Sequence, residues 1–336
     1  MAAPRQAPGA GRANTTRPGV ARTRRAPVAA RVMTVTGPVP PDRIGFTLPH
    51  EHTGVRLWGA PAREDYWELR KDEDLLAEEL ADFRRRGGSC LVDLTTDEIG
   101  RDPRWLRRLA SRTGVFIVMG SGWYRQLHYP PDSVDRRTVD ELAGIIVREF
   151  EEGVAPTGVR PGIIGEIGTD KWWVSAQEER VFRAAARAGR RTGLAVSTHA
   201  LASDVGLAQL EVLTDEGLDP ARVVVGHADT YPDLDYHLAV LARGASVQFD
   251  TLGTPEAARR EPRAVALIVE LLERGYASQI LLSHDVCHDD HLRANGGNGY
   301  GYLAQHFLPA LRTAAVAEGE IRQMTVENPR RILTIG

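Results

Sequence analysis

Lysine is nearly absent from this chain of 336 residues, in which Lys71 and Lys171 are the two lysines among many arginines. A mechanism that needs a lysine therefore has two candidates. Cysteine is as scarce, and Cys90 and Cys287 lie too far apart for the Cys-x-x-Cys spacing of zinc and redox sites. Two thiols do not form a disulfide framework either, so we expect a reduced, cytoplasmic setting.

Long apolar runs are missing as well. No apolar window of about 18 residues exists, which argues against a membrane span. The net charge is -3, which gives the chain no global electrostatic reason to bind nucleic acid. Hydrophobic residues make up 42% and charged residues 26% of the chain, as in ordinary globular proteins. We therefore expect a globular protein without a nucleic-acid or membrane partner.

Acidic residues are missing from residues 1–32, which contain many Arg, Ala, Pro and Gly. Such a composition cannot bury a core, so this segment is expected to be a disordered extension. It lacks the apolar stretch of a secretory signal, although an organelle transit peptide or a basic arm would have a similar composition. The simplest interpretation is a dispensable extension followed by a single folded domain over residues 33–336.

From residue 44 onward, short apolar runs alternate with longer amphipathic segments. The runs expected to be strands cover 45–49, 89–94, 115–119, 162–167, 195–198, 223–226, 246–249 and 279–283. The segments expected to be helices cover 75–86, 103–112, 139–151, 178–192, 206–216, 233–243, 263–274 and 299–317. Repeated strand–helix units predict an α/β fold, and eight of them predict a (β/α)8 TIM barrel. An open doubly wound sheet is the alternative, but no Gly-rich dinucleotide loop follows a strand.

Histidines and carboxylates stand at the ends of the expected strands, where the active site of such a barrel lies. His50 and His52 are two residues apart, so in a strand they point to the same side while Glu51 points away. Four more metal-binding side chains occupy later strands or their ends: Glu166, His199, His227 and Asp285. A single histidine there is commonly a polar barrel residue, and Asp285 alone could cap a helix. Together the six residues predict a site for two divalent metal ions, with Zn favoured over Mn, Co or Fe.

Long motifs support this interpretation and carry a family resemblance. They are GPVPPDRIGFTLPHEH (37–52), GIIGEIGTD (162–170), TGLAVSTH (192–199), GLDPARVVVGH (217–227), GASVQFDTLG (244–253), ILLSHD (280–285), RANGGNGYGYL (293–303) and ENPRRIL (327–333). With them the chain resembles the phosphotriesterase-related branch of the amidohydrolase superfamily. That resemblance implies a binuclear metal-dependent hydrolase with an amidohydrolase-type barrel.

The resemblance also implies a role for each metal-binding residue. His50, His52 and Asp285 would hold the more buried metal, whereas His199 and His227 would hold the more exposed one. Many members bridge the metals with a carboxylated lysine, but neither lysine of this chain fits that place. The resemblance therefore points to the glutamate-bridged branch, with Glu166 as the bridge.

Two metals sharing a hydroxide would supply a nucleophile at neutral pH, and Asp285 would accept its proton. We expect a carboxylic ester or lactone as the small-molecule substrate. A phosphoester or phosphotriester, a biosynthetic cyclising or rearranging reaction, and a non-catalytic barrel stay open as alternatives. The residues expected to contact substrate are Tyr124, Arg125, Trp172, His284 and His288. No basic fork for a phosphate is evident, although Arg259, Arg260 and Arg293 could supply one, and a homodimer stays open.

Overall fold

The structure is a computed structural model that describes residues 1–3, 29–57 and 67–336. Most of the extension expected over residues 1–32 lies outside these residues. Its last two residues do not belong to an extension, because strand β1 begins at Arg31 and Val32 is fully buried. Val32 pairs with Thr334 on one side and with Val39 on the other. The boundary expected at residue 33 is therefore two residues too late, since both partners lie outside the local sequence pattern.

Eight parallel strands form the centre of the described chain, and each one matches an expected strand to within a few residues. They are β3 (Phe46–Glu51), β6 (Gly88–Asp93), β7 (Phe116–Met119), β8 (Ile164–Gly168), β9 (Val196–His199), β10 (Val223–Val225), β11 (Ser246–Phe249) and β12 (Ile280–Leu282). They form two parallel ladders, β3-β6-β7 and β8-β9-β10-β11-β12. The order follows the chain, as a barrel of strand–helix units requires.

Backbone hydrogen bonds connect the two ladders at both seams. On one side the Gly162 amide donates to the Met119 carbonyl at 2.9 Å. On the other side the Asp285 amide donates to the His50 carbonyl at 3.2 Å. These bonds join β7 to the entrance of β8 and β12 to β3, so the strands close into the predicted (β/α)8 barrel.

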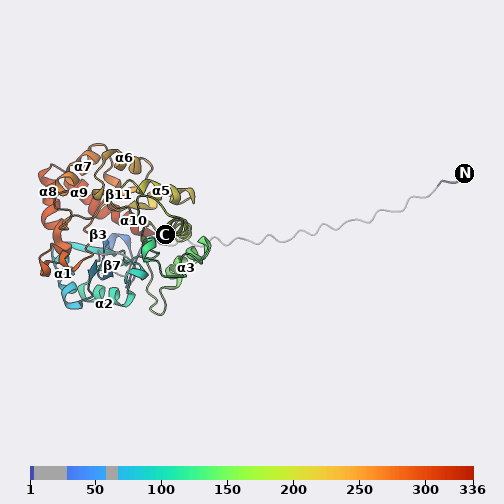
Figure 1. Ribbon diagram of the computed structural model, residues 1–336, viewed down its shortest axis with the longest axis horizontal. Helices are drawn as coiled ribbons and strands as arrows, with labels where there is room; N and C mark the ends of the chain where they lie inside the picture. Colours follow the sequence, from blue (N-terminus) through green and yellow to red (C-terminus); the bar gives the residue numbers. More distant parts are fainter. Residues whose placement is uncertain (4–28, 58–66) are drawn as a thin grey trace.

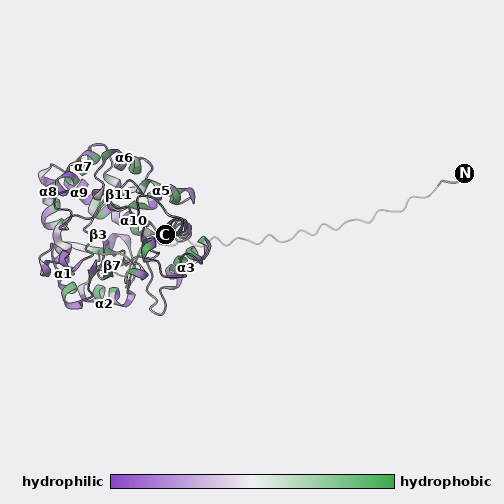
Figure 2. Cartoon of the chain, in the orientation of Figure 1, coloured by the Kyte–Doolittle hydropathy of each residue, from purple (hydrophilic) through white to green (hydrophobic). Residues whose placement is uncertain are grey.

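Helices surround the strands (Figure 1) and present alternating polar and apolar stretches (Figure 2). They are α1 (Glu73–Arg85), α2 (Pro103–Thr113), α3 (Val139–Glu152), α4 (Ala176–Thr192), α5 (Gly206–Asp215), α6 (Leu234–Ala242), α7 (Glu261–Glu273), α8 (Leu308–Thr313), α9 (Glu318–Arg322) and α10 (Asn328–Leu333). Helix α4 shows why they form where they do. Its capping box joins Ser175 and Glu178, and its buried positions include Val181, Phe182 and Ala185, one face of a helix. The helix expected over 299–317 is shorter, because 3-10 and π turns precede α8.

The inside of the barrel is filled by side chains that alternate along the strands. In β6, Cys90 and Val92 lie in a small interior cluster, whereas Leu91 lies in the larger cluster that includes the helices. Val32 and Ile332 belong to the same interior cluster. The three-stranded antiparallel sheet of β1, β2 (Gly37–Val39) and β13 (Thr334–Ile335) therefore links both ends of the domain to the barrel interior.

Two short strands, β4 (Val55–Arg56) and β5 (Glu68–Leu69), pair with each other on either side of the undescribed residues 58–66. None of the helices in the described ranges has the length and apolar character needed to cross a lipid bilayer.

Candidate metal centre

The two histidines of β3 point into the barrel mouth. His50 Nε2 lies 3.5 Å from Glu166 Oε2 and 3.8 Å from Asp285 Oδ1. His52 Nε2 lies 3.3 Å from Glu166 Oε1 and 3.3 Å from the same Asp285 oxygen. The strand end therefore directs both imidazoles toward the carboxylates of β8 and of the segment after β12, as the two-residue spacing predicts.

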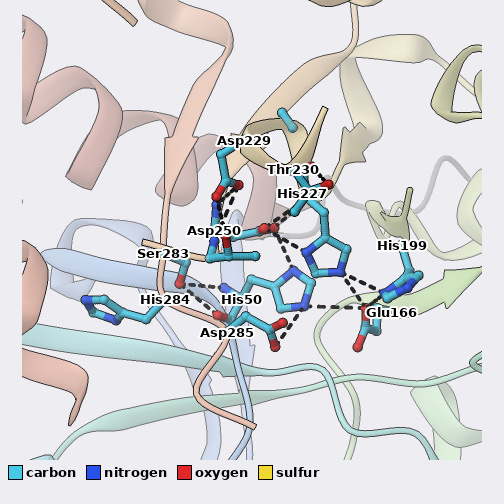
Figure 3. A network of polar contacts seen from close by, with 12 residues as sticks. His50, Glu166, His199, His227, Asp229, Thr230, Asp250, Ser283, His284 and Asp285 are labelled. Atoms are coloured by element: carbon cyan, nitrogen blue, oxygen red, sulfur yellow. Dashed lines mark hydrogen bonds and ion pairs between the residues drawn. The ribbon is translucent and has the colours of Figure 1, made fainter. Parts of the chain in front are cut away.

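His199 at the end of β9 and His227, two residues after β10, approach Oε2 of Glu166 (Figure 3). His199 Nδ1 lies 3.0 Å and His227 Nε2 lies 3.6 Å from Glu166 Oε2. The two histidine nitrogens are 2.7 Å apart. Glu166 thus turns Oε1 toward His52 and Oε2 toward the remaining histidines. A carboxylate in this position can serve two cations at once.

The residues fit two divalent metal ions. Two groups have ligand atoms that all lie within 4.8 Å of one another, His50–Glu166–His227 and His50–His52–Asp285. Zinc bonds of about 2.0–2.2 Å separate two ligands by about 3.4 Å in a tetrahedral site. The distances of 3.3–3.8 Å from His50 and His52 to the Glu166 and Asp285 oxygens are close to this value. His50 Nε2 is buried without a hydrogen-bond partner among the described residues. A buried imidazole nitrogen of this kind is costly unless it binds something, and a metal ion satisfies it.

Backbone conformation gives independent support. His227 has a φ of 57° and Asp285 a φ of 54°, in the left-handed region that non-glycine residues rarely adopt. Each such residue costs roughly 1–3 kcal/mol and persists where function or packing demands it. Both lie at the barrel mouth, so two of the five non-glycine residues with positive φ in the described chain are proposed ligands.

Asp250 follows β11 and is a site residue that the sequence analysis missed. Its fully buried carboxylate accepts from His227 Nδ1 at 2.8 Å and lies 3.0 Å from His50 Nδ1 (Figure 3). It also accepts from the His227 backbone amide at 3.0 Å. One carboxylate thereby orients two metal-facing histidines from different strands. The only signal in the sequence is an acidic residue at the end of the seventh barrel strand.

Neighbouring Gly226 allows this approach. A Cβ at Gly226 would lie 2.4 Å from the Thr198 carbonyl oxygen and 3.3 Å from Asp250 Oδ2. A larger residue would therefore push apart β9 and β10 at the point where Asp250 reaches His227.

Electrostatics act differently on the carboxylate and on the imidazoles of the cluster. Burial by itself raises the pKa of Glu166, but nearby histidines, His50 foremost, outweigh it and hold that pKa well below its ordinary value. Burial and the charge of His227 lower the pKa of His199 to about 3, despite the opposing effect of Glu166. Burial acts in the same direction on His52 and His227, but neighbouring carboxylates outweigh it and raise the pKa of these rings to about 9 and about 10. Glu166 and His199 are therefore in the forms that bind a metal, whereas a metal ion would have to displace a proton from His52 and His227.

Glu51 points away from the centre, as expected, and its carboxylate is hydrogen-bonded to His284. Glu51 Oε1 accepts from His284 Nδ1 at 2.9 Å, and His284 Nε2 accepts from the Leu303 amide at 3.0 Å. His284 is therefore buried behind the barrel wall and is not a substrate contact. The expectation failed because His284 precedes Asp285 by one residue and so faces the opposite side of the chain.

A cavity of about 360 Å³ opens over the centre. Of the described residues, its lining consists of Leu57, Trp67, Tyr124, Arg125, His128, His199, Leu201, Ala202, His227, Thr230, Thr251, Thr254, Glu256, Arg260, Asp285, Cys287 and His291. Two of the residues expected to contact substrate, Tyr124 and Arg125, line this cavity, with the Tyr124 hydroxyl 3.3 Å from His199 Nδ1.

Two other expected contacts do not line this cavity. Trp172 is 75% exposed, and its ring packs against Trp173 with centroids 5.8 Å apart. The ring of His288 packs instead against Trp67, with centroids 5.3 Å apart. The sequence places Trp172 and His288 in loops near the barrel mouth, but it does not specify the direction in which each ring points. His237, on α6, is fully buried, with Nε2 2.9 Å from the Ala228 carbonyl.

An α/β barrel with histidines and carboxylates converging at its mouth, below a cavity, defines a metal-dependent hydrolase. The model of the phosphotriesterase family matches residues 30–333. The chain therefore belongs to the phosphotriesterase family, as its motifs indicate.

Individual relatives agree in sequence and in structure. The phosphotriesterase homology protein of Escherichia coli is 37% identical over 289 residues, covering 86% of this chain and 97% of that protein. Its crystal structure, complexed with phosphate in the active site, matches with a TM-score of 0.81 at 35% identity, covering 87% of this chain and 99% of that chain. A phosphotriesterase-like lactonase of Deinococcus radiodurans, in a mutant form, matches with a TM-score of 0.78 at 31% identity, covering 90% and 99%. The N-acetyltaurine hydrolase of Xenopus tropicalis is 28% identical, covering 91% and 99%.

Proposed function

We propose that this hydrolase cleaves a carboxylic ester or lactone with the help of two metal ions held at the barrel mouth. The observation that carries the proposal is the placement of Glu166. Its two oxygens face different sets of histidines, with distances of 3.3 Å to His52 Nε2 and 3.0 Å to His199 Nδ1. The cavity lies directly over this arrangement, because His199, His227 and Asp285 are among its lining residues.

Bound divalent metals would supply a Lewis acid for the substrate carbonyl and would lower the pKa of a metal-bound water. The protein residues would perform the remaining tasks. The metals would be held by His50, His52, Glu166, His199, His227 and Asp285. Asp250 would orient His50 and His227. The Asp285 side chain is 18% exposed at the cavity wall, whereas that of Glu166 is 3% exposed, and this access suits proton transfer to a leaving group.

The cavity wall favours an acyl substrate. Leu57, Trp67 and Leu201 give it an apolar side, and Tyr124 places a hydroxyl donor beside His199. Such a wall suits the uncharged body of an ester or a lactone. Two kinds of relatives support acyl chemistry by name, since one is a lactonase and the other hydrolyses the amide N-acetyltaurine.

Phosphoester or phosphotriester hydrolysis is the second candidate. It is favoured by the Escherichia coli relative, whose active site binds phosphate in the crystal. The expected biosynthetic and non-catalytic alternatives are not retained, because the family consists of hydrolases.

A substrate panel tests the proposal. Protein reconstituted with zinc or manganese is assayed on lactones, aryl esters and phosphotriesters, together with Asp285→Asn. Asp290→Asn is the matched control, because Asp290 is an exposed acid in the same loop. We expect lactones or esters to be turned over faster than phosphotriesters, with the activity strongly reduced in Asp285→Asn and kept in Asp290→Asn. Turnover of phosphotriesters alone, or near wild-type turnover of substrates with poor leaving groups by Asp285→Asn, would contradict the proposal.

A further inference from the structure

Glu98 is a half-buried acid in the short 3-10 helix η2 (Asp97–Ile99), which follows β6. Its Oε1 accepts a hydrogen bond from the Tyr124 backbone amide, and its Oε2 is buried without a hydrogen-bond partner among the described residues. Burial raises the pKa of Glu98 to about 7, despite the Tyr124 amide and the charge of Arg101. Burying such a carboxylate costs free energy, and the bond to Tyr124 is what the protein gains from it.

Arg101, whose charge acts on Glu98, is engaged elsewhere. Its two terminal nitrogens donate to the two oxygens of Glu149, at 2.7 Å each. The same arginine donates to the Gly120 carbonyl at 3.2 Å, and Glu149 also accepts from the Ser121 hydroxyl at 2.6 Å. The pair of Arg101 and Glu149 therefore anchors the beginning of the segment after β7, and Glu98 is left to hold the segment further along.

Tyr124 lies in this segment and is held through its backbone by two different elements. Its carbonyl accepts from the amide of Gly168, the last residue of β8, at 2.6 Å. Its amide is bound by Glu98, from the segment after β6. Because β7 lies between the β6 and β8 units of the barrel, Tyr124 is fixed from both sides of its own strand.

The side chain of Tyr124 stands at the cavity wall as a result. Its hydroxyl is 3.3 Å from His199 Nδ1, and its ring meets the His199 ring edge to face with centroids 5.0 Å apart. The guanidinium of Arg125 lies 4.6 Å from the Tyr124 ring centroid. A carboxylate that fixes the backbone of Tyr124 therefore also fixes the place of its hydroxyl over the metal centre.

From this arrangement we infer that Glu98 is a positioning residue, which acts through the Tyr124 backbone to hold the Tyr124 hydroxyl where it can donate to a bound substrate. Glu98 is not among the described residues that line the cavity, so it would not touch the substrate itself. Its removal should affect the reaction only as far as Tyr124 does. This inference rests on the proposed function, because it assigns a task to a hydroxyl of the same cavity.

Hydrogen exchange tests the hold on Tyr124 without any substrate. Exchange of the Tyr124 amide in the zinc-loaded protein is followed by mass spectrometry with overlapping peptides over residues 120–128. The wild type is compared with Glu98→Ala and Glu98→Gln. Asp97→Asn is the matched control, because Asp97 is an exposed acid one residue away whose side chain contacts Arg101 at 3.9 Å. Zinc content and melting temperature verify that each variant is folded.

We expect the Tyr124 amide to exchange about tenfold faster in Glu98→Ala, the size of one hydrogen bond to a charged group. Glu98→Gln keeps an acceptor oxygen but not the charge, so its rate should fall between those of the wild type and Glu98→Ala. Asp97→Asn should exchange like the wild type. Unchanged exchange in Glu98→Ala, or an equal change in Asp97→Asn, would overturn the inference.

A double-mutant cycle tests whether Glu98 acts through the Tyr124 hydroxyl. The value of kcat/KM is measured for Glu98→Ala, Tyr124→Phe and the double variant, on whichever substrate of the panel is turned over best. We expect each single variant to lose about tenfold and the double variant to lose little more than Tyr124→Phe alone. If Glu98→Ala does not fold, Glu98→Gln replaces it in the cycle.

A purely structural role would give losses that add up, so full additivity would overturn the inference. The proposed function fails separately from it. If phosphotriesters alone are turned over, the cycle is carried out on them. Coupled losses would then refute ester or lactone hydrolysis and still support the positioning role of Glu98.

Discussion

Replacing Asp250 with asparagine should disturb the metal centre without touching a residue that faces the metals. The Asp250 carboxylate lies 2.8 Å from His227 Nδ1 and 3.0 Å from His50 Nδ1, one oxygen for each ring. Asparagine has one carbonyl oxygen and one amino group in their place. Whichever way the amide turns, its amino group faces the N–H of one imidazole. One of the two histidines therefore loses its acceptor and meets a second donor.

The loss of zinc affinity in Asp250→Asn depends on which histidine loses its acceptor. Losing the partner behind a metal-binding histidine typically lowers metal affinity about 10–100-fold, or about 1.4–2.8 kcal/mol. His50 belongs to both groups of converging ligand atoms, whereas His227 belongs to one. We therefore expect at least one zinc ion to bind about 10–100-fold more weakly in Asp250→Asn, and both to weaken if the amide turns its amino group to His50.

Zinc titration against a competing chelator measures this change, and zinc content after dialysis provides a second readout. Asp229→Asn is the matched control. Asp229 is a buried acid beside the same strand, but it accepts from the Asp250 amide and from Thr251, and within the described residues it accepts from no histidine. The Asp229→Asn variant should therefore keep its zinc. If Asp250→Asn binds two zinc ions as tightly as the wild type, or if Asp229→Asn loses as much, the role assigned to Asp250 is wrong.

Three further predictions follow from the same geometry. Asp285→Asn should keep much of its metal but lose about 10²–10⁴-fold in kcat, with a smaller loss for substrates with good leaving groups, as a comparison of aryl esters would show. Glu166→Gln should lose zinc, because a neutral amide bridges two cations poorly, and wild-type zinc loading should not respond to added bicarbonate; a strong bicarbonate requirement would argue against a glutamate bridge. A chain that begins at Met33 should be about 1.5–3 kcal/mol less stable in urea than one that begins at residue 29, because it lacks the buried side chain of Val32; equal urea midpoints would show that β1 contributes little.

The sequence by itself determined the barrel and the residues of the candidate centre. Strand and helix periodicities are local, so they can be read without knowing any distant contact. In a barrel of parallel strands, all the strand ends meet at one mouth. Residues as far apart in the chain as His52, Glu166 and His227 could therefore be assigned to one site before their distances were known.

The tertiary structure alone decided which side chains support the centre and which contact the cavity. Asp250 contacts both His50 and His227, and Arg260 lines the cavity whereas its neighbour Arg259 does not. His284 differs from Asp285 by one position, yet it is bonded to Glu51 behind the wall. The physical reason is the same in each case. A hydrogen bond or an ion pair depends on a few ångströms between groups that are distant in sequence, and no local pattern of polar and apolar residues specifies that distance.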